Sequence, residues 1–369
     1  MQNSPLKFNQ HFISLDILRG LCAITVFIWH CFAHIDNRFL DNYFFHFIYF
    51  SLLRASDIAI IIFFTLCGFF SINSFLKYTP PPSKFGPFKA LITFYVARGV
   101  RILPLTIITV LTSAAITYLY RLVHSDFRTW GFYDDFNLVK LSAFGLDSHW
   151  NRPLWTLKYE IFFYITLPFL ILILFKNAIA YRIISVALLL LLFYAGFIDK
   201  TSIFYINLPH LLLPFIFGSL LYLVKDLKLF FLVFKNKKII IYVSIISIIY
   251  LSCDYLTTEP FNLKKYFAVL LFLAAIICFE KFFVANKKTV CIKILLKLSA
   301  SSYSLYLWHW PVILFTALYF NGDFRARNLL EIIRLFSIAI PTLIIIVFAS
   351  WWFIERNANM KTLRKLIAK

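Results

Sequence analysis

The chain has 369 residues, of which 61% are hydrophobic and 15% are charged, and its mean hydropathy is +0.81. A soluble core of this length cannot hide so much apolar surface from water, so the composition excludes an ordinary soluble domain. The formal net charge of +20 would indicate a nucleic-acid partner in a soluble chain. Here the lysines and arginines lie between apolar runs, where they set membrane topology, and we expect no nucleic-acid partner.

Ten apolar runs are long enough to cross a bilayer, and they predict an all-α membrane protein. The first run contains Asp16, Arg19 and His30 and lacks a small-residue cleavage site, so we expect a retained helix rather than a signal peptide. The ten runs are 14–34, 57–76, 102–122, 155–175, 183–199, 205–224, 239–256, 266–285, 303–320 and 332–354.

The basic residues give these spans a direction. With both termini in the cytoplasm, the inside segments carry 23 lysines and arginines, and the outside loops carry 10. This excess follows the positive-inside rule, so we expect both termini to be cytoplasmic.

The first span carries two ionisable residues that are expensive to place in lipid. Arg19 and His30 are eleven residues apart, which brings them to within about 20° of one helix face and separates them by about 16 Å. One interpretation gives Arg19 an anionic cytoplasmic donor to hold and makes His30 a general base. The alternatives are an interface anchor for Arg19 and a hydrogen-bonded core histidine for His30. Asp16, one turn earlier, is a candidate partner for Arg19.

Arg98 and Arg101 stand at the cytoplasmic entry to the third span. Residues three apart share a helix face, so this pair suits a phosphate or diphosphate group. The alternative is again an inside anchor. The placement of Arg19 at the same membrane face favours binding of the donor.

The fourth span has a lone carboxylate, Glu160, about one turn inside its outer boundary. A carboxylate at this depth needs a partner, and His30 lies at a similar depth. Such a pair would orient the imidazole, as the acid does in a catalytic triad. The alternative is an interfacial salt bridge from Glu160 to Lys158 or Arg152.

The ninth span contains a proline, Pro311, beside His309. Proline frees a backbone carbonyl one turn earlier, so we expect a bent, polar helix that lines a cavity. The alternative is an aromatic belt of Trp308 and Trp310. Five residues are predicted to line the cavity. The ninth span contributes Tyr303, Tyr306 and Trp308, and other spans contribute Asp16 and Trp155.

Five segments together resemble the acyltransferase-3 family of bacterial inner-membrane acyltransferases. They follow the family's order over almost the whole chain, and the first gives the spacing Arg-x10-His. Cys67 departs from the family's usual serine. The matching segments are 15–20 with His30, 63–69, Arg98 and Arg101 with Pro104, 155–164, and 303–311.

This resemblance implies a membrane-bound O-acyltransferase in the bacterial inner membrane, formed as a single membrane domain over 1–369 without an appended extracytoplasmic hydrolase-like domain. It implies acyl-CoA, most often acetyl-CoA, as a co-substrate and no permanently bound cofactor or metal. The acceptor would be a hydroxyl of a carbohydrate or glycolipid, with lipopolysaccharide O-chain our first choice. The expected catalytic residues are His30, Glu160 and His309, and the expected donor-binding residues are Arg19, Arg98 and Arg101.

Two other classes of protein stay open from the residues alone. A transporter or flippase for an anionic glycolipid would use the same buried cations without acyl chemistry. The sequence has no repeat symmetry of the kind found in many transporters. A purely structural membrane subunit would not need four ionisable residues within its spans, namely Arg19, His30, Glu160 and His309.

Overall fold

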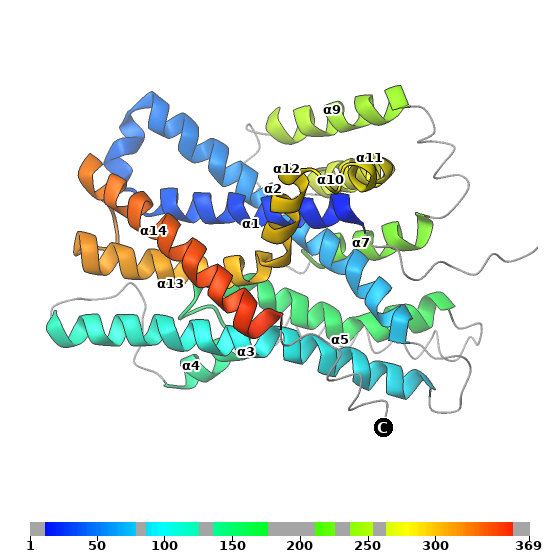
Figure 1. Cartoon of the computed structure of the whole chain (residues 1–369), viewed down its shortest axis with the longest axis horizontal. Coiled ribbons are helices and arrows are strands. Elements are labelled where there is room, and N and C mark those ends of the chain that lie inside the picture. The colour runs from blue at the N-terminus through cyan, green and yellow to red at the C-terminus, as the bar shows by residue number, and fades with distance from the viewer. Residues whose placement is uncertain are drawn as a thin grey trace, which may run out of the picture. The chain divides into compact units, whose positions relative to one another are not determined.

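A computed structural model describes residues 12–78, 86–124, 136–175, 211–225, 237–253 and 263–356. Within these ranges the chain is helical and has no β-strand, apart from one isolated bridge between Ile35 and Ala326 (Figure 1). The prediction of an all-α protein is therefore confirmed for this part of the chain. The helices are α1 (Ile13–Ala33), η1 (Asn37–Asp41), α2 (Tyr43–Tyr78), α3 (Gly86–Val123), α4 (Phe136–Ala143), η2 (Arg152–Leu154), α5 (Trp155–Phe175), α7 (Leu212–Val224), α9 (Lys237–Cys253), α10 (Leu263–Cys278), α11 (Glu280–Ala285), α12 (Val290–Ala300), α13 (Ser302–Asn321), α14 (Leu329–Ser350) and η5 (Trp351–Glu355).

Five of the described helices are long and apolar enough to cross a membrane, and a sixth span results if α12 and α13 count as one bent span. Every predicted run except 183–199 overlaps a described helix, and 183–199 lies outside the described residues. Helices α7 and α9 are apolar but shorter than a full span. The count of ten spans and the cytoplasmic termini stay predictions.

Two helices extend well beyond their predicted starts. α2 begins at Tyr43 rather than near residue 57, and α3 begins at Gly86 rather than near residue 102. Their 36 and 38 residues correspond to more than about 50 Å of helix, whereas the hydrocarbon core is about 30 Å thick. The hydropathy of the sequence marks only the apolar part of such a helix. Arg98 and Arg101 therefore lie inside a helix rather than at its first turn.

The ninth span has a bend at Ser301 that the sequence did not predict. α12 and α13 meet at Ser301 with a bend of 66°, whereas α13 continues through Pro311 as a single α-helix. A bend within α13 at Pro311 stays a prediction, and the hydrogen bonds described below show how the helix continues through its proline.

The described helices form two compact units. Unit 1 comprises Met1–Arg19, Ile61–Arg98 and Phe162–Leu296, and unit 2 comprises Gly20–Ile60, Gly99–Ile161 and Lys297–Lys369. In unit 1, α2 and α7 pack with almost no space between their backbones. A Cβ atom at Gly68 would collide with the carbonyl of Phe215, and one at Gly218 would collide with the carbonyl of Thr65. Small residues commonly permit such close helix packing in membranes.

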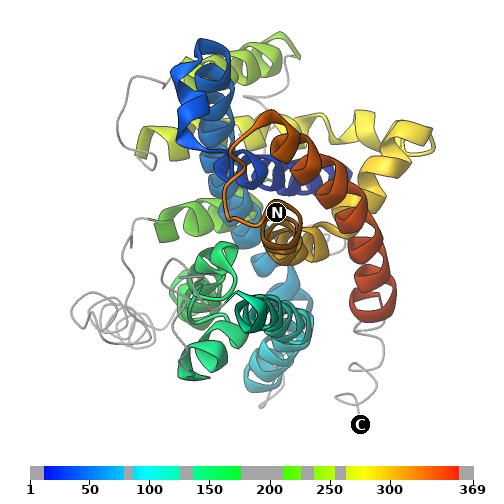
Figure 2. The ribbon, with the colours of Figure 1, turned by 90° about the vertical axis from the view of Figure 1, so that its left-hand side faces the viewer.

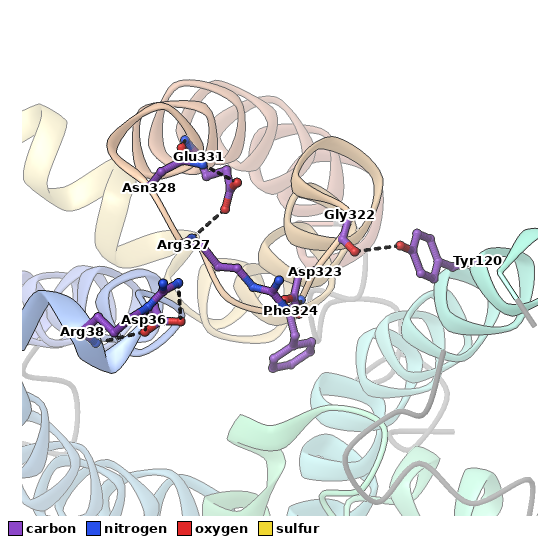
Figure 3. A network of polar contacts seen from close by, with 9 residues as sticks. All are labelled: Asp36, Arg38, Tyr120, Gly322, Asp323, Phe324, Arg327, Asn328 and Glu331. Atoms are coloured by element: carbon purple, nitrogen blue, oxygen red, sulfur yellow. Dashed lines mark hydrogen bonds and ion pairs between the residues drawn. The ribbon is translucent and has the colours of Figure 1, made fainter. Parts of the chain in front are cut away.

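In unit 2, α13 packs along α14, and two views at right angles agree on this (Figures 1 and 2). The loop between these helices also holds the segment that follows α1. Ala326 donates its backbone N–H to the carbonyl of His34 at 2.8 Å, and the N–H of Asp36 donates to the carbonyl of Ala326 at 2.9 Å. Tyr120 of α3 donates its hydroxyl to the carbonyl of Gly322 in the same loop (Figure 3). The two bonds of Ala326 thus fix the segment after α1 to the α13–α14 loop, and the bond of Tyr120 joins α3 to the same loop.

Candidate active site

Two of the predicted catalytic residues lie side by side in unit 2. The ring centroids of His30 on α1 and His309 on α13 are 4.8 Å apart, with the rings tilted by 50°. His309 is completely buried, and His30 is partly buried. The structure therefore brings together two imidazoles that are 279 positions apart in the chain.

Hydrogen bonds to the backbone determine which nitrogen of each ring carries the proton. His30 donates through Nδ1 to the carbonyl of Val26 at 2.8 Å, and His309 donates through Nδ1 to the carbonyl of Leu305 at 3.3 Å. A carbonyl oxygen only accepts, so each Nδ1 must bear a hydrogen. Each neutral ring then keeps a lone pair on Nε2, and Nε2 is the atom that can act as a base.

A third histidine, His34, lies one turn beyond His30 and was missed in the sequence. Its Nδ1 donates to the carbonyl of His30 at 2.8 Å, and its ring lies 5.4 Å from Trp310 and 4.7 Å from Phe324. The i, i+4 spacing from His30 was the signal that could have found it. Among the described residues, no group of three His, Cys, Asp or Glu side chains is arranged to hold a metal ion.

The two tyrosines predicted to line a cavity bind neighbouring helices. The hydroxyl of Tyr306 donates to the carbonyl of Pro153, and Thr156 Oγ1 lies 2.6 Å from the same hydroxyl. The hydroxyl of Tyr303 lies 3.1 Å from Thr106 Oγ1 on α3 and 3.1 Å from the carbonyl oxygen of Ile102. These bonds connect α13 to the start of α5 and to α3.

Glu160 and Arg101 both belong to unit 2, as do Tyr303 and Tyr306. Within the described part of the chain, His30 contacts Val26, His309 and Trp310, and its carbonyl accepts from His34. The pairing of Glu160 with His30 therefore stays a prediction.

The remaining aromatic candidates also lie in unit 2. Trp155 packs its ring edge-on against Tyr159 at 5.8 Å. The indole N–H of Trp308 is buried and has no hydrogen-bond partner among the described residues. Neither observation tests a cavity-lining role, which stays a prediction for both.

The carbonyl freed by Pro311 has a partner that the sequence did not reveal. Proline lacks an N–H, so the carbonyl of Leu307, four residues earlier, loses its helical donor. Asn151 donates through Nδ2 to this carbonyl at 3.1 Å, and its side chain is completely buried. The sequence predicted a freed carbonyl, and the structure shows that Asn151 is its donor. This bond helps α13 to continue through Pro311.

The loop that carries Asn151 is itself held by a carboxylate. Asp147 accepts hydrogen bonds from the hydroxyl of Ser142 at 3.1 Å and from the backbone N–H of His149 at 2.8 Å. Burial lowers the pKa of His149 below its usual value, and the charge of Asp147 opposes that shift. The same loop therefore has a fixed shape where it enters η2 and α5.

Two of the predicted donor-binding arginines lie in unit 1. Arg19 pairs with Asp16 at 3.3 Å, as their spacing suggested, and its guanidinium lies 5.8 Å from the centre of the Phe70 ring. Arg98 lies over the rings of Phe94 and Tyr164, at 5.3 and 5.0 Å, in the geometry of cation–π contacts. Arg101 lies in unit 2 and is exposed. A common donor site formed by the three arginines stays a prediction.

Residues 12–353 match the family described as an acyltransferase domain. The chain belongs to this acyltransferase family. No curated protein and no solved structure matches the chain. The family match, together with the apolar helices, makes the chain a membrane acyltransferase of a family that acts on carbohydrates.

The acyltransferase has two further carboxylates that sequence reasoning did not assign. Glu280 accepts hydrogen bonds from the backbone N–H groups of Ile13 and Ser14, at 2.7 and 3.0 Å, and from the Ser14 hydroxyl. Glu355 accepts from the backbone N–H of Ser304 at 2.7 Å and from its hydroxyl. These N–H groups have no partner within their own helix, and a carboxylate there also interacts favourably with the helix dipole. Glu280 thus caps α1, and Glu355 caps α13.

Proposed function

We propose that this acyltransferase moves an acetyl group from cytoplasmic acetyl-CoA to a hydroxyl of a lipid-linked or extracytoplasmic carbohydrate, in the bacterial inner membrane. The observation that carries the proposal is the pair of imidazoles, His30 and His309, in a chain of the acyltransferase family. A surface polysaccharide such as the O-chain of lipopolysaccharide is the preferred acceptor.

His30 is the general base of the proposed reaction. Its Nε2 removes the proton of the acceptor hydroxyl while the oxygen attacks the carbonyl carbon of the thioester. The carbon–sulfur bond then breaks, and the coenzyme A thiolate leaves and takes the proton from His30. The products are an O-acetyl ester and free coenzyme A, and His30 returns to its neutral form.

His309 supports this step without being a second base. Its buried ring faces His30, and its Nδ1 is committed to the carbonyl of Leu305. A neutral imidazole beside His30 offers a polar neighbour to the imidazolium that forms, without the repulsion that a second cation would cause. Glu160 orients the imidazole of His30 in this proposal, and Tyr303 and Tyr306 line the path of the acyl group.

The three arginines hold the donor. Guanidinium groups form charge-assisted, bidentate hydrogen bonds with phosphate oxygens, and coenzyme A carries such phosphates. In the proposed orientation, Arg19 lies on the cytoplasmic side of His30 along α1, so a donor bound there directs its thioester toward His30. Arg98 and Arg101 add positive charge from α3.

Release of coenzyme A from labelled acetyl-CoA tests the proposal directly. We expect purified protein to release coenzyme A and label a glycolipid acceptor when both substrates are present. Longer acyl-CoA donors would show whether acetyl is preferred, and the glycans of a deletion strain, compared by mass, would reveal a lost acetyl group. An intact protein that moves a glycolipid across a vesicle membrane and releases no coenzyme A would overturn the proposal.

A further inference from the structure

Asn151, the residue directly before η2, donates an unusual hydrogen bond to α13. Asn151 has no exposed surface, and its Nδ2 donates to the carbonyl of Leu307, which Pro311 deprives of its helical donor. The partner is a carbonyl, so the amide can have only one orientation, with the nitrogen toward α13. The side chain of Asn151 therefore takes the place of the missing N–H of residue 311.

This replacement matters because an interior proline usually kinks or breaks a helix. α13 nevertheless continues as a single α-helix from Ser302 to Asn321. A buried carbonyl without any donor would lose a hydrogen bond in a region where water cannot replace it. The bond from Asn151 removes that penalty.

A second bond runs in the opposite direction between the same two segments. Tyr306 of α13 donates its hydroxyl to the carbonyl of Pro153, two residues after Asn151, and Thr156 binds that hydroxyl at 2.6 Å. Each segment thus gives one side chain to a backbone carbonyl of the other. We call this pair of bonds, from Asn151 to Leu307 and from Tyr306 to Pro153, the reciprocal clasp.

His309 lies within the turn of α13 that the reciprocal clasp holds. It falls between Leu307 and Pro311, and its own Nδ1 bonds to the carbonyl of Leu305. A kink in this turn would move the imidazole relative to His30, whose ring centre is 4.8 Å away. The position of His309 thus depends on a donor that comes from outside its helix.

We propose that Asn151 is a positioning residue of the acyl-transfer reaction, which holds the His309 turn of α13 in register with His30 by donating to the carbonyl of Leu307. The inference rests on the proposed function for its catalytic consequence. Its structural part, the replacement of a missing helical donor, stands on the hydrogen bonds alone.

A double-substitution cycle tests this role. In Asn151→Ala the carbonyl of Leu307 has no donor, and we expect kcat to fall roughly 10- to 100-fold because the His309 turn shifts. KM for acetyl-CoA should change little, since Asn151 does not touch the donor. Pro311→Ala restores a backbone N–H to residue 311, so the double variant Asn151→Ala/Pro311→Ala should recover most of the lost kcat. A double variant no more active than Asn151→Ala would overturn the proposal, as would an unchanged kcat in Asn151→Ala.

Two further variants separate this role from general damage. Asn286→Ala is the matched control, because Asn286 also donates through Nδ2 to a backbone carbonyl, that of Phe282 at 2.9 Å, in an exposed setting. We expect it to retain full activity. Asn151→Leu keeps the approximate size of the side chain but has no donor, so it should behave like Asn151→Ala; wild-type kcat in Asn151→Leu would contradict a role through Nδ2.

The melting temperature keeps this test independent of the proposed function. If the wild-type protein releases no coenzyme A, the proposed function fails, but the clasp is still tested by melting. Asn151→Ala should then lower the melting temperature, and the added Pro311→Ala should raise it again. Equal melting temperatures for Asn151→Ala and the double variant would show that Asn151 does not act through the Leu307 carbonyl.

Discussion

The two units use their buried polar groups differently. In unit 1, Glu280 accepts three hydrogen bonds at the start of α1, and Arg19 pairs with Asp16. In unit 2, His309 and Asn151 each donate one hydrogen bond to a backbone carbonyl, His309 through Nδ1 and Asn151 through Nδ2. Their other polar atoms, Nε2 and Oδ1, are buried and have no hydrogen-bond partner among the described residues.

This difference distinguishes polar residues that stabilise the fold from polar residues that are available for catalysis. A carboxylate that accepts bonds from a helix start is committed to structure, because releasing it would leave backbone N–H groups unsatisfied. A neutral imidazole bonded only through Nδ1 keeps a basic lone pair available. Unit 2 therefore holds the imidazoles suited to proton transfer, and Arg19 and Arg98 of unit 1 are suited to binding an anion. Each unit also has one carboxylate committed to a helix start, Glu280 in unit 1 and Glu355 in unit 2.

The largest expected effect comes from His30. His30→Ala should lower the rate of coenzyme A release by about 10²- to 10⁴-fold, since general-base catalysis contributes a factor of this size. The measurement is kcat/KM with labelled acetyl-CoA and a glycolipid acceptor. His46→Ala, which removes an exposed histidine from α2, is the control and should retain activity. Wild-type turnover by folded His30→Ala protein would show that His30, like the capping carboxylates, has only a structural role.

The two capping carboxylates give the next effect and compare the units directly. Glu280→Ala and Glu355→Ala each remove a cap, and each should lower stability by about 1–3 kcal/mol. Thermal melting in detergent measures this loss. We expect only Glu355→Ala to reduce kcat as well, since Glu355 holds the start of α13, which carries His309.

Equal losses of kcat in both capping variants, at matched stability, would contradict the division between the units. Glu331→Ala is a control for the loss of a helix-start carboxylate. Glu331 lies in the first turn of α14, and its carboxylate accepts from the backbone N–H of Arg327 at 2.6 Å in an exposed setting. Glu331→Ala should lower stability less than the loss of either of the two partly buried caps, Glu280 and Glu355.

A smaller effect is expected from Arg19. Arg19→Ala should raise KM for acetyl-CoA by roughly tenfold, about 1.4 kcal/mol of binding, and change kcat less. Arg19→Lys keeps the charge but loses the bidentate geometry, so its KM should be intermediate. The control is Arg327→Ala, which removes an exposed arginine paired with Asp323 in the α13–α14 loop. A lower melting temperature with an unchanged KM would make Arg19 purely an anchor for Asp16.

The sequence predicted well those features that lipid dictates. The runs 14–34, 155–175 and 303–320 correspond to α1 (Ile13–Ala33), α5 (Trp155–Phe175) and α13 (Ser302–Asn321). A bilayer requires an apolar stretch of defined length, so the apolar pattern alone locates these helices. The start of α2 was missed because His46 and Arg54 interrupt its hydropathy without interrupting its helix.

Contacts between distant segments could not be predicted in the same way. Glu280 binds the N–H groups of Ile13 and Ser14 across more than 260 residues, and Asn151 binds Leu307 across 156. No periodicity connects such pairs. Pro311 indicates that some donor must reach the carbonyl of Leu307, but the residue itself does not specify which donor, because that depends on how α13 meets the segment before α5.

The smallest expected effect concerns the turn that follows α1. Asp36 accepts hydrogen bonds from the backbone N–H of Arg38 at 2.9 Å and from its guanidinium (Figure 3). These bonds, the backbone one first, hold the pKa of Asp36 below its usual value. The carboxylate therefore stabilises the folded state above the usual aspartate pKa of about 4, and this contribution is lost as the pH falls through the lower folded value.

Melting temperatures of wild type and Asp36→Asn should accordingly differ at pH 7 and converge toward pH 3. Asp41→Asn, at an exposed aspartate in the same turn, is the control. The difference should be small because the Asp36–Arg38 pair faces solvent. A difference that persists unchanged at pH 3 would mean that the side chain acts through packing and not through its charge.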